Sequence, residues 1–376
     1  MYTTTNNNTD DYIKINLRGD IRNIQNIFEL YFFDYIREVF LLDNQLIRDD
    51  ILDNVLVGKA YKLLDVDTIK YFVNHGASIK VSSYRLIGKA SSYGCLEAVE
   101  LLINLGIDVQ VGDNYAIKAA CINHHLEIVK LLIKHGANVN AGNNCAVRYA
   151  SQYGHLEIVR LLIACGADIQ AMNNCAVRYA SENNHLEIVR LLINHGADIT
   201  SENNYAVISA SAEGHLEIVK LLIDHGADIH YAIINASIRG HLDIIRILIN
   251  YGANIQVINN NPIKYACQGG NLQALQLLID CGANIHADDD YAIKHASKLG
   301  YAEIIKLLIN AGADITVDNN IPIRYASRHG HLEIVKLLIE LGADVTANDN
   351  EAIKLAYGNN HLDVVNLLIE YGAAII

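Results

Sequence analysis

The sequence predicts an all-α solenoid of about eleven helix-turn-helix units with short connectors and an N-terminal helical cap. Two markers indicate this fold: a glycine in the phrase Gly-Ala-Asp-Ile or a close variant, and an alanine in the preceding helical segment. Both recur every 30 residues, with one step of 26 residues. A fixed period of this length is typical of arrays in which each unit packs on its neighbours. The glycine column is Gly76, Gly106, Gly136, Gly166, Gly196, Gly226, Gly252, Gly282, Gly312, Gly342 and Gly372.

Each unit holds two short helical segments. In the unit over residues 145–169, the first segment ends at Gly154, where other units have Gly, Asn or His, residues suited to a left-handed helix end. The second segment places Leu156, Val159 and Leu162 on one face. Two such helices cannot close a core alone, so we expect each pair to bury its apolar face against the next pair.

Three regions follow from the extent of the repeat. Residues 1–11, rich in Thr, Asn and Asp, are expected to be disordered. Residues 12–54 do not fit the unit, and their apolar spacing predicts a helical cap or degenerate repeat, with docking of a partner as the alternative role. Residues 55–376 form the array, whose last unit has no polar cap and either tolerates exposure or meets a partner or second copy.

The composition argues against several functions. A net charge of −13 and a pI of about 5.6 repel phosphate backbones, so we expect no nucleic-acid partner. No apolar run approaches the ~18 residues of a membrane span, and the start lacks the features of a signal peptide. We therefore expect an intracellular protein that does not bind a membrane.

No sequence pattern indicates chemistry. The sequence has no Gly-rich phosphate loop, nucleophile elbow or clustered metal-ligand spacing, so it predicts no enzyme, catalytic residue, cofactor, metal or small-molecule substrate. We expect a monomer whose seven cysteines are reduced thiols, since no CxxC pair occurs. A histidine column has a predicted structural role, because neighbours about 10 Å apart cannot share one ion. That column is His125, His155, His185, His215, His241, His331 and His361.

Polar pairs precede most of the first helices. Asn143-Asn144 is one example, and we interpret the second residue of each pair as an N-cap that accepts hydrogen bonds from its own helix, with plain turn residues as the alternative. A basic column on the first helices, such as Lys118 and Arg148, either pairs within the array, for example with connector aspartates such as Asp168, or forms a cationic stripe for an acidic partner.

The phrase Gly-His-Leu-Glu-Ile-Val-Lys/Arg-Leu-Leu-Ile-x-x-Gly-Ala-Asp-Ile, as in residues 214–229 and 330–345, resembles the ankyrin-repeat family. The resemblance implies L-shaped units and a concave protein-binding surface. The chain departs from the family in its 30-residue unit, against about 33. It also lacks the family's Thr-Pro-Leu-His tetrad, which becomes, for example, Tyr-Ala-Ile-Lys over residues 115–118.

The short unit and the heavy use of Asn and Ile look like the ankyrin proteins of amoeba-infecting giant viruses of the mimivirus type. This narrower resemblance implies a viral protein that is made in the cytoplasm of an infected amoeba. We expect its unidentified partner to be a host protein.

Two kinds of position are candidates for contact with a partner. Tyrosines on the first helices offer amphipathic contact area, and the pairs before each helix-end glycine differ most between repeats. The candidate partner-binding residues are Tyr149, Tyr153, Tyr179, Glu182, Tyr265, Tyr325 and Arg328. The sequence thus favours a protein-interaction scaffold. The alternative is a substrate adaptor whose N-terminal helices recruit host machinery such as a ubiquitin ligase.

Overall fold

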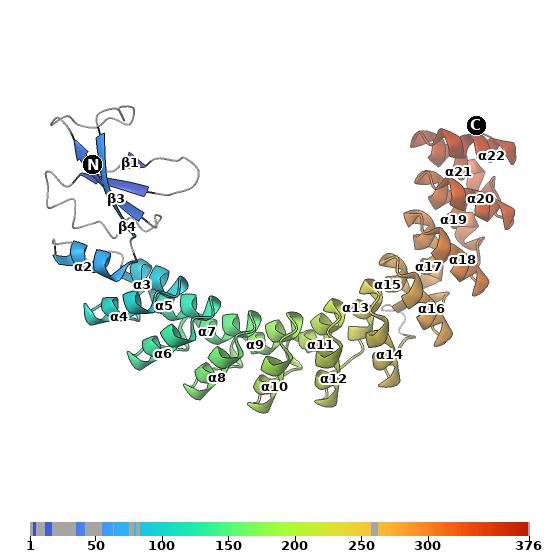
Figure 1. Cartoon of the computed structure of the whole chain (residues 1–376). Helices are drawn as coiled ribbons and strands as arrows, with labels where there is room; N and C mark the ends of the chain where they lie inside the picture. Colours follow the sequence, from blue (N-terminus) through green and yellow to red (C-terminus); the bar gives the residue numbers. More distant parts are fainter. Residues whose placement is uncertain are drawn as a thin grey trace. The chain divides into compact units, whose positions relative to one another are not determined.

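The computed structural model describes residues 64–74, 79, 83–256 and 262–374, together with the backbone of four strands within residues 3–62 (Figure 1). The chain divides into two compact units. Unit 1 comprises residues 1–180 and 191–197, and unit 2 comprises residues 181–190 and 198–376.

Unit 1 contains a row of first helices and a row of second helices, as Figure 1 shows. The first helices α3, α5 and α7 pack side by side, and so do the second helices α2, α4, α6 and α8. Their bounds are α2 (Val66–Asn74), α3 (Ser83–Ser92), α4 (Leu96–Asn104), α5 (Val111–Ile122), α6 (Leu126–Lys134), α7 (Ala141–Gln152) and α8 (Leu156–Ala164). The next pair, α9 (Ala171–Glu182) and α10 (Leu186–Asn194), holds the division between the units.

Unit 2 repeats the same arrangement six times. Each first helix from α11 to α19 contacts the next first helix. Among the second helices, α12 contacts α14, α14 contacts α16, α16 contacts α18, and α20 contacts α22. The first helices are α11 (Ser201–Glu213), α13 (Ala232–Arg239), α15 (Pro262–Gln268), α17 (Ala287–Leu299), α19 (Val317–Arg328) and α21 (Ala347–Gly358). The second helices are α12 (Leu216–Asp224), α14 (Leu242–Asn250), α16 (Leu272–Asp280), α18 (Ala302–Asn310), α20 (Leu332–Glu340) and α22 (Leu362–Glu370).

The core is a layer shared between neighbouring pairs. Val147 and Ala150 of α7 are fully buried, as are Val159 and Leu162 of α8. Each large apolar side chain contributes roughly 1.5–3 kcal/mol when it is buried, and the small alanine lets adjacent first helices approach closely. The predicted all-helical solenoid is confirmed for the array, with ten complete described pairs and α2 as the second helix of an eleventh.

Seven first helices are preceded by a turn of left-handed backbone. Before α7 proper, Gly142, Asn143 and Asn144 have φ values of 59°, 55° and 58°. The turn closes with a hydrogen bond of 3.2 Å from the Asn144 amide to the Asn140 carbonyl. Left-handed backbone costs most residues roughly 1–2 kcal/mol, and Gly, Asn and Asp tolerate it best. This tolerance explains why polar pairs recur before the first helices.

The N-cap interpretation of these pairs is wrong. Asn144 Oδ1 accepts a hydrogen bond of 3.1 Å from the amide of Asp168, in the connector after the following helix. An N-cap residue needs an extended backbone, which a left-handed residue lacks. The same link of 24 residues joins Asn114 to Asn138, Asn204 to Asp228, Asn320 to Asp344 and Asn350 to Ala374.

The step of 26 residues has a local explanation. The connector before α13 passes from Asp228 to Ala232 without any left-handed residue, so the four missing residues correspond to that turn. The ring of His230 then replaces the missing asparagine, because its Nδ1 lies 3.3 Å from the amide of Asn254. The repeat therefore keeps its link to the next connector.

The region before the array differs from the expected helical cap. The strands β1 (Thr3–Thr4), β2 (Tyr12–Asn16), β3 (Tyr35–Leu41) and β4 (Val55–Lys62) form one sheet in that order, with β2 and β3 parallel. β2 and β3 fall inside residues 12–54, and their Tyr, Ile, Val and Phe content favours strands. β4 occupies the place of the first helix of the array. The remainder of residues 1–54 lies outside the described residues.

Candidate protein-binding surface

The ends of the first helices form a surface that we call the helix-end strip. It consists of the two residues before each left-handed helix-end residue. In unit 1 these are residues 92–93, 122–123 and 152–153. In unit 2 they are residues 182–183, 212–213, 238–239, 268–269, 298–299, 328–329 and 358–359.

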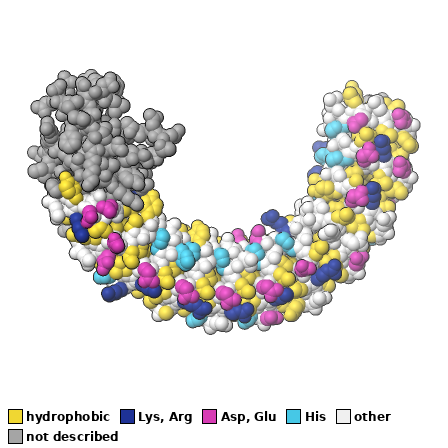
Figure 2. All heavy atoms as spheres, in the orientation of Figure 1, with side chains coloured by type: hydrophobic (Ala, Val, Ile, Leu, Met, Phe, Trp, Pro, Cys, Tyr) yellow, Lys and Arg dark blue, Asp and Glu magenta, His cyan; other side chains and the backbone are white. Residues whose placement is uncertain are grey.

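A ladder of histidines fixes the strip. His155 Nε2 lies 3.0 Å from the Ile122 carbonyl oxygen, at the end of the preceding first helix. A carbonyl oxygen only accepts, so Nε2 carries the proton, and the bond satisfies a carbonyl that has no donor within its own helix. Equivalent contacts of 2.9 to 3.1 Å join His125 to Ser92, His215 to Glu182, His241 to Ala212, His331 to Lys298 and His361 to Arg328. Figure 2 shows histidine side chains following one another along one edge of unit 1.

Several ladder histidines pack directly on a helix-end glycine of the preceding repeat. Gly330 has a φ of 73°, and a Cβ added there would lie 2.5 Å from Nδ1 of His361. The imidazole therefore packs directly against the glycine backbone. With Nε2 bound to a carbonyl, each ladder histidine has a structural role, and the described residues contain no cluster of three or more potential metal ligands.

In unit 1 the structure brings two candidate residues together. Tyr153 is half exposed, and its ring stacks on Tyr149 and on His155, at centroid distances of 6.4 and 6.2 Å. His155 in turn stacks on the exposed ring of His124 at 4.4 Å. We call Tyr149, Tyr153, His155 and His124 the aromatic patch. His124 is not among the residues predicted from the sequence, although it occupies the helix-end position where glycine is usual.

Tyr179 lies elsewhere in the unit. It is partly buried, and its pKa is raised chiefly by a hydrogen bond with Cys175. Its hydroxyl therefore already has a partner within the chain. This makes Tyr179 a weaker candidate than Tyr149 or Tyr153.

In unit 2 the four candidate residues lie on three first helices, with Tyr325 and Arg328 together on α19. Glu182 is partly buried and its carbonyl accepts from His215, while Tyr265 and Tyr325 are partly buried on α15 and α19. Arg328 is exposed at the end of α19. The structure places Lys298 at the matching position of α17, one repeat earlier. Lys298 precedes Arg328 by one repeat of 30 residues, so this spacing could have identified Lys298 as a candidate from the sequence.

The basic column is largely neutralised within the array. Lys118 lies 2.5 Å from Asp113, Lys294 lies 2.8 Å from Asp318, and Arg324 pairs with Glu351. Asp113 and Asp318 belong to left-handed turns, and Glu351 lies on α21, the first helix that follows α19 in the row. The aspartates of the Gly-Ala-Asp-Ile phrase instead accept from their own connector. For example, bonds from the Thr346 hydroxyl and amide lower the pKa of Asp344.

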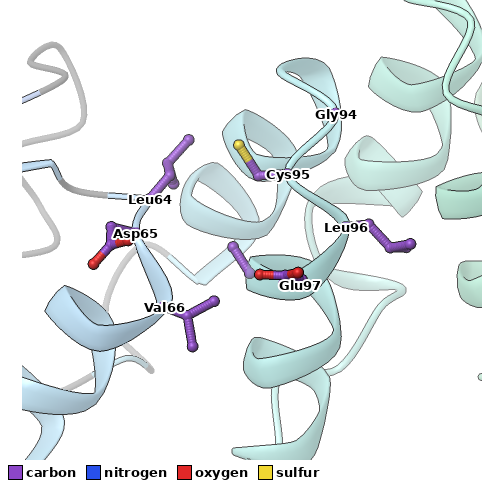
Figure 3. A pocket seen from close by; sticks show the side chains of 8 residues that line it. Leu64, Asp65, Val66, Gly94, Cys95, Leu96 and Glu97 are labelled. Carbon is purple, nitrogen blue, oxygen red and sulfur yellow. The ribbon is translucent and has the colours of Figure 1, made fainter.

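A hollow of about 400 Å³ lies in unit 1 between the starts of α2 and α4. Figure 3 shows Asp65 on one side of it and Cys95 on the other. Cys95 occupies the ladder position that holds histidine in most other repeats, which leaves space beside it. The Asp65 carboxylate accepts from the amide and hydroxyl of Thr68. The hollow thus lies where the histidine ladder ends, one repeat before His125.

Together, the stacked helix pairs, the connector links and the histidine ladder define a helical repeat protein. A family model described as ankyrin repeats in three copies matches residues 89–173, 170–233, 229–289 and 292–376, so the chain belongs to the ankyrin-repeat family. No curated protein matches the chain. Ankyrin repeats are typically non-catalytic modules that bind proteins. Within the described part of the chain, no helix is both long and apolar enough to cross a membrane.

Proposed function

We propose that this protein is a scaffold that binds another protein through the helix-end strip and the adjoining first-helix tyrosines. In the ankyrin proteins that the chain resembles, the matching positions contact partners. The observation that supports the proposal most directly is the contrast within one helix. Val147 and Ala150 of α7 are fully buried, and the matching positions of other repeats hold similar residues. Tyr153, which follows the end of α7, is half exposed, and the residue at its position differs from repeat to repeat.

The aromatic patch has the properties of an anchor for a partner. Tyrosine contributes a large amphipathic surface, and a few such residues commonly dominate the binding energy of an interface. The stacking of Tyr153 on Tyr149 and His155 holds the ring in place before binding. Preorganisation of this kind lowers the entropic cost of association.

The partner we propose is a host-cell protein, in the cytoplasm of an infected cell. The resemblance of the 30-residue unit to giant-virus ankyrin proteins supports this proposal. All seven cysteines are free thiols, which suits a reducing compartment. The adaptor alternative depended on helices within residues 12–54, and the strands β2 and β3 in that region weaken its premise.

A capture experiment with matched variants tests the proposal. Immobilised full-length chain is incubated with amoebal lysate, beside the double variant Tyr149→Ala/Tyr153→Ala and the control Arg160→Ala, which changes an exposed residue of the second helix α8. We expect the natural chain to capture a specific protein and the tyrosine variant to capture at least tenfold less of it. The control should capture the same amount as the natural chain, and both variants should keep native helicity. Equal capture by all three proteins would refute the proposed surface.

A further inference from the structure

Basic side chains gather around the ends of α17 and α19 in unit 2. We call Lys298, Arg328, His329, His331 and His361 the basic end cluster. His331 and His361 hold the carbonyls of Lys298 and Arg328, at 3.0 and 3.1 Å, so the ladder fixes the backbone that carries both cations. His329 stacks on His331 at a centroid distance of 6.1 Å. Figure 2 shows histidine side chains close together toward the C-terminal end of this unit.

No carboxylate neutralises the cluster within the described residues. Lys298 and Arg328 are exposed and neither has an ion-pair partner there, in contrast to Lys294 and Arg324 one turn earlier on the same helices. The carboxylates that begin the neighbouring second helices are already occupied. Glu303 pairs with Lys306, Glu333 pairs with Lys336, and Asp363 accepts from the amide of Val364.

The titration of the nearby histidines agrees with a positive potential. The pKa of His329 is lowered first by burial and then by His331, Arg328, Lys298 and His361. The pKa of His295, on α17, is lowered by burial and then by Lys298 and Lys264. Within the described part of the chain, the charges that lower these two pKa values all come from basic side chains. An anion placed beside the cluster would therefore meet uncompensated charge.

We propose that the basic end cluster binds an acidic segment of the partner protein through Lys298 and Arg328. The inference rests on the proposed function and adds the chemistry of one contact. Hydrogen bonds from Lys and Arg to carboxylates are charge-assisted and stronger than neutral ones. A nucleic acid is the less favoured anion, since the cluster is small and the chain carries a net charge of −13.

The spacing of the cluster suggests a sequence pattern for the ligand. Lys298 and Arg328 occupy the same position on adjacent first helices, which lie roughly 8–10 Å apart when packed. A peptide in the polyproline II conformation advances about 3.1 Å per residue and presents every third side chain on the same side. Acidic residues three positions apart, as in Asp-x-x-Glu, would thus reach one cation each.

Fluorescence anisotropy tests this inference with the full-length chain. The probe is a labelled peptide with repeated Asp-x-x-Glu, compared with the same peptide bearing Asn and Gln, a phosphoserine peptide and a single-stranded DNA. The test variant is Lys298→Ala/Arg328→Ala. The control is Lys306→Ala/Lys336→Ala, which removes the same charge from the second helices of the same repeats.

We expect the acidic peptide to bind, the amide peptide to bind at least tenfold more weakly, and the test variant to lose about tenfold in affinity while the control changes less than twofold. No binding by the acidic peptide, equal losses in test and control, or tighter binding of phosphopeptide or DNA would overturn the inference. The tyrosine-dependent capture described above would be unaffected by such a failure, so the two proposals fail separately.

Discussion

The side-chain oxygen of Asn320 accepts a hydrogen bond of 2.9 Å from the amide of Asp344, 24 residues further along the chain. Asn320 is buried and left-handed, with a φ of 59°. One residue thus ends the turn before a first helix and also ties its repeat to the connector of the next. The repeated asparagine is therefore a link between neighbouring repeats, and its hydrogen-bond partner lies outside the helix that it precedes.

Two substitutions separate these roles of Asn320. Asn320→Gly keeps the left-handed backbone and removes the hydrogen bond, so we expect a loss of about 1 kcal/mol in the free energy of unfolding. Asn320→Ala removes the bond and adds the backbone strain of a left-handed alanine, for a loss of about 2 kcal/mol or more. Urea denaturation of both variants measures the difference. Equal stability of Asn320→Ala and the natural chain would refute the link.

The packing of the histidine ladder on glycine predicts a position-dependent cost. Gly312→Ala should cost only the left-handed strain of about 1 kcal/mol, because a Cβ there meets no atom within 4 Å. Gly330→Ala should cost at least 1 kcal/mol more, since its Cβ would collide with the His361 ring. Thermal unfolding of the two variants in parallel provides the test. A Gly312→Ala variant as unstable as Gly330→Ala would contradict the ladder.

The buried serine column offers a stabilising change. Ser151 is fully buried, and its hydroxyl has no hydrogen-bond partner among the described residues. In contrast, the buried Ser237 hydroxyl donates to the Ile233 carbonyl at 2.7 Å. Burial of an unpaired hydroxyl costs about 1–3 kcal/mol. Ser151→Ala should therefore raise the free energy of unfolding by about 1 kcal/mol, and Ser237→Ala should not. Chemical denaturation measures both, and a Ser151→Ala variant less stable than Ser237→Ala would disprove the expectation.

Acidification should weaken the fold through His329. Its pKa in the folded chain is lowered by burial and by four cationic neighbours, so the unfolded chain takes up the proton first as the pH falls. Stability should thus fall as the pH drops below about 7 toward the folded pKa. His329→Gln should make the dependence of stability on pH shallower between about pH 7 and 5. An unchanged pH profile in that variant would exclude a contribution from His329.

Much of the array was predictable because its signals are local. The period of the glycines and the apolar spacing in residues such as Val159 and Leu162 identify the helix pairs directly. The partner of Asn144 was not predictable, because the amide it meets lies in the next connector and only the stacked structure brings the two together. Lys298 was overlooked for a similar reason: its importance depends on which neighbouring carboxylates are already paired.

The N-terminal region shows the limit of apolar spacing. The segment that became β3, Tyr35–Leu41, is rich in aromatic and β-branched residues, which fit a strand as well as an apolar helix face. Its pairing with β2 and β4 decides between the two, and such pairing is not local in sequence.

Site-specific photocrosslinking tests the central claim most directly. A benzoylphenylalanine at position 153, at the end of a first helix, is compared with one at position 160, an exposed position of the second helix α8. Both full-length variants are exposed to amoebal lysate. We predict a discrete crosslinked partner from position 153 and none from position 160. The same crosslinked protein from both positions, or from position 160 alone, would contradict binding through the helix-end strip.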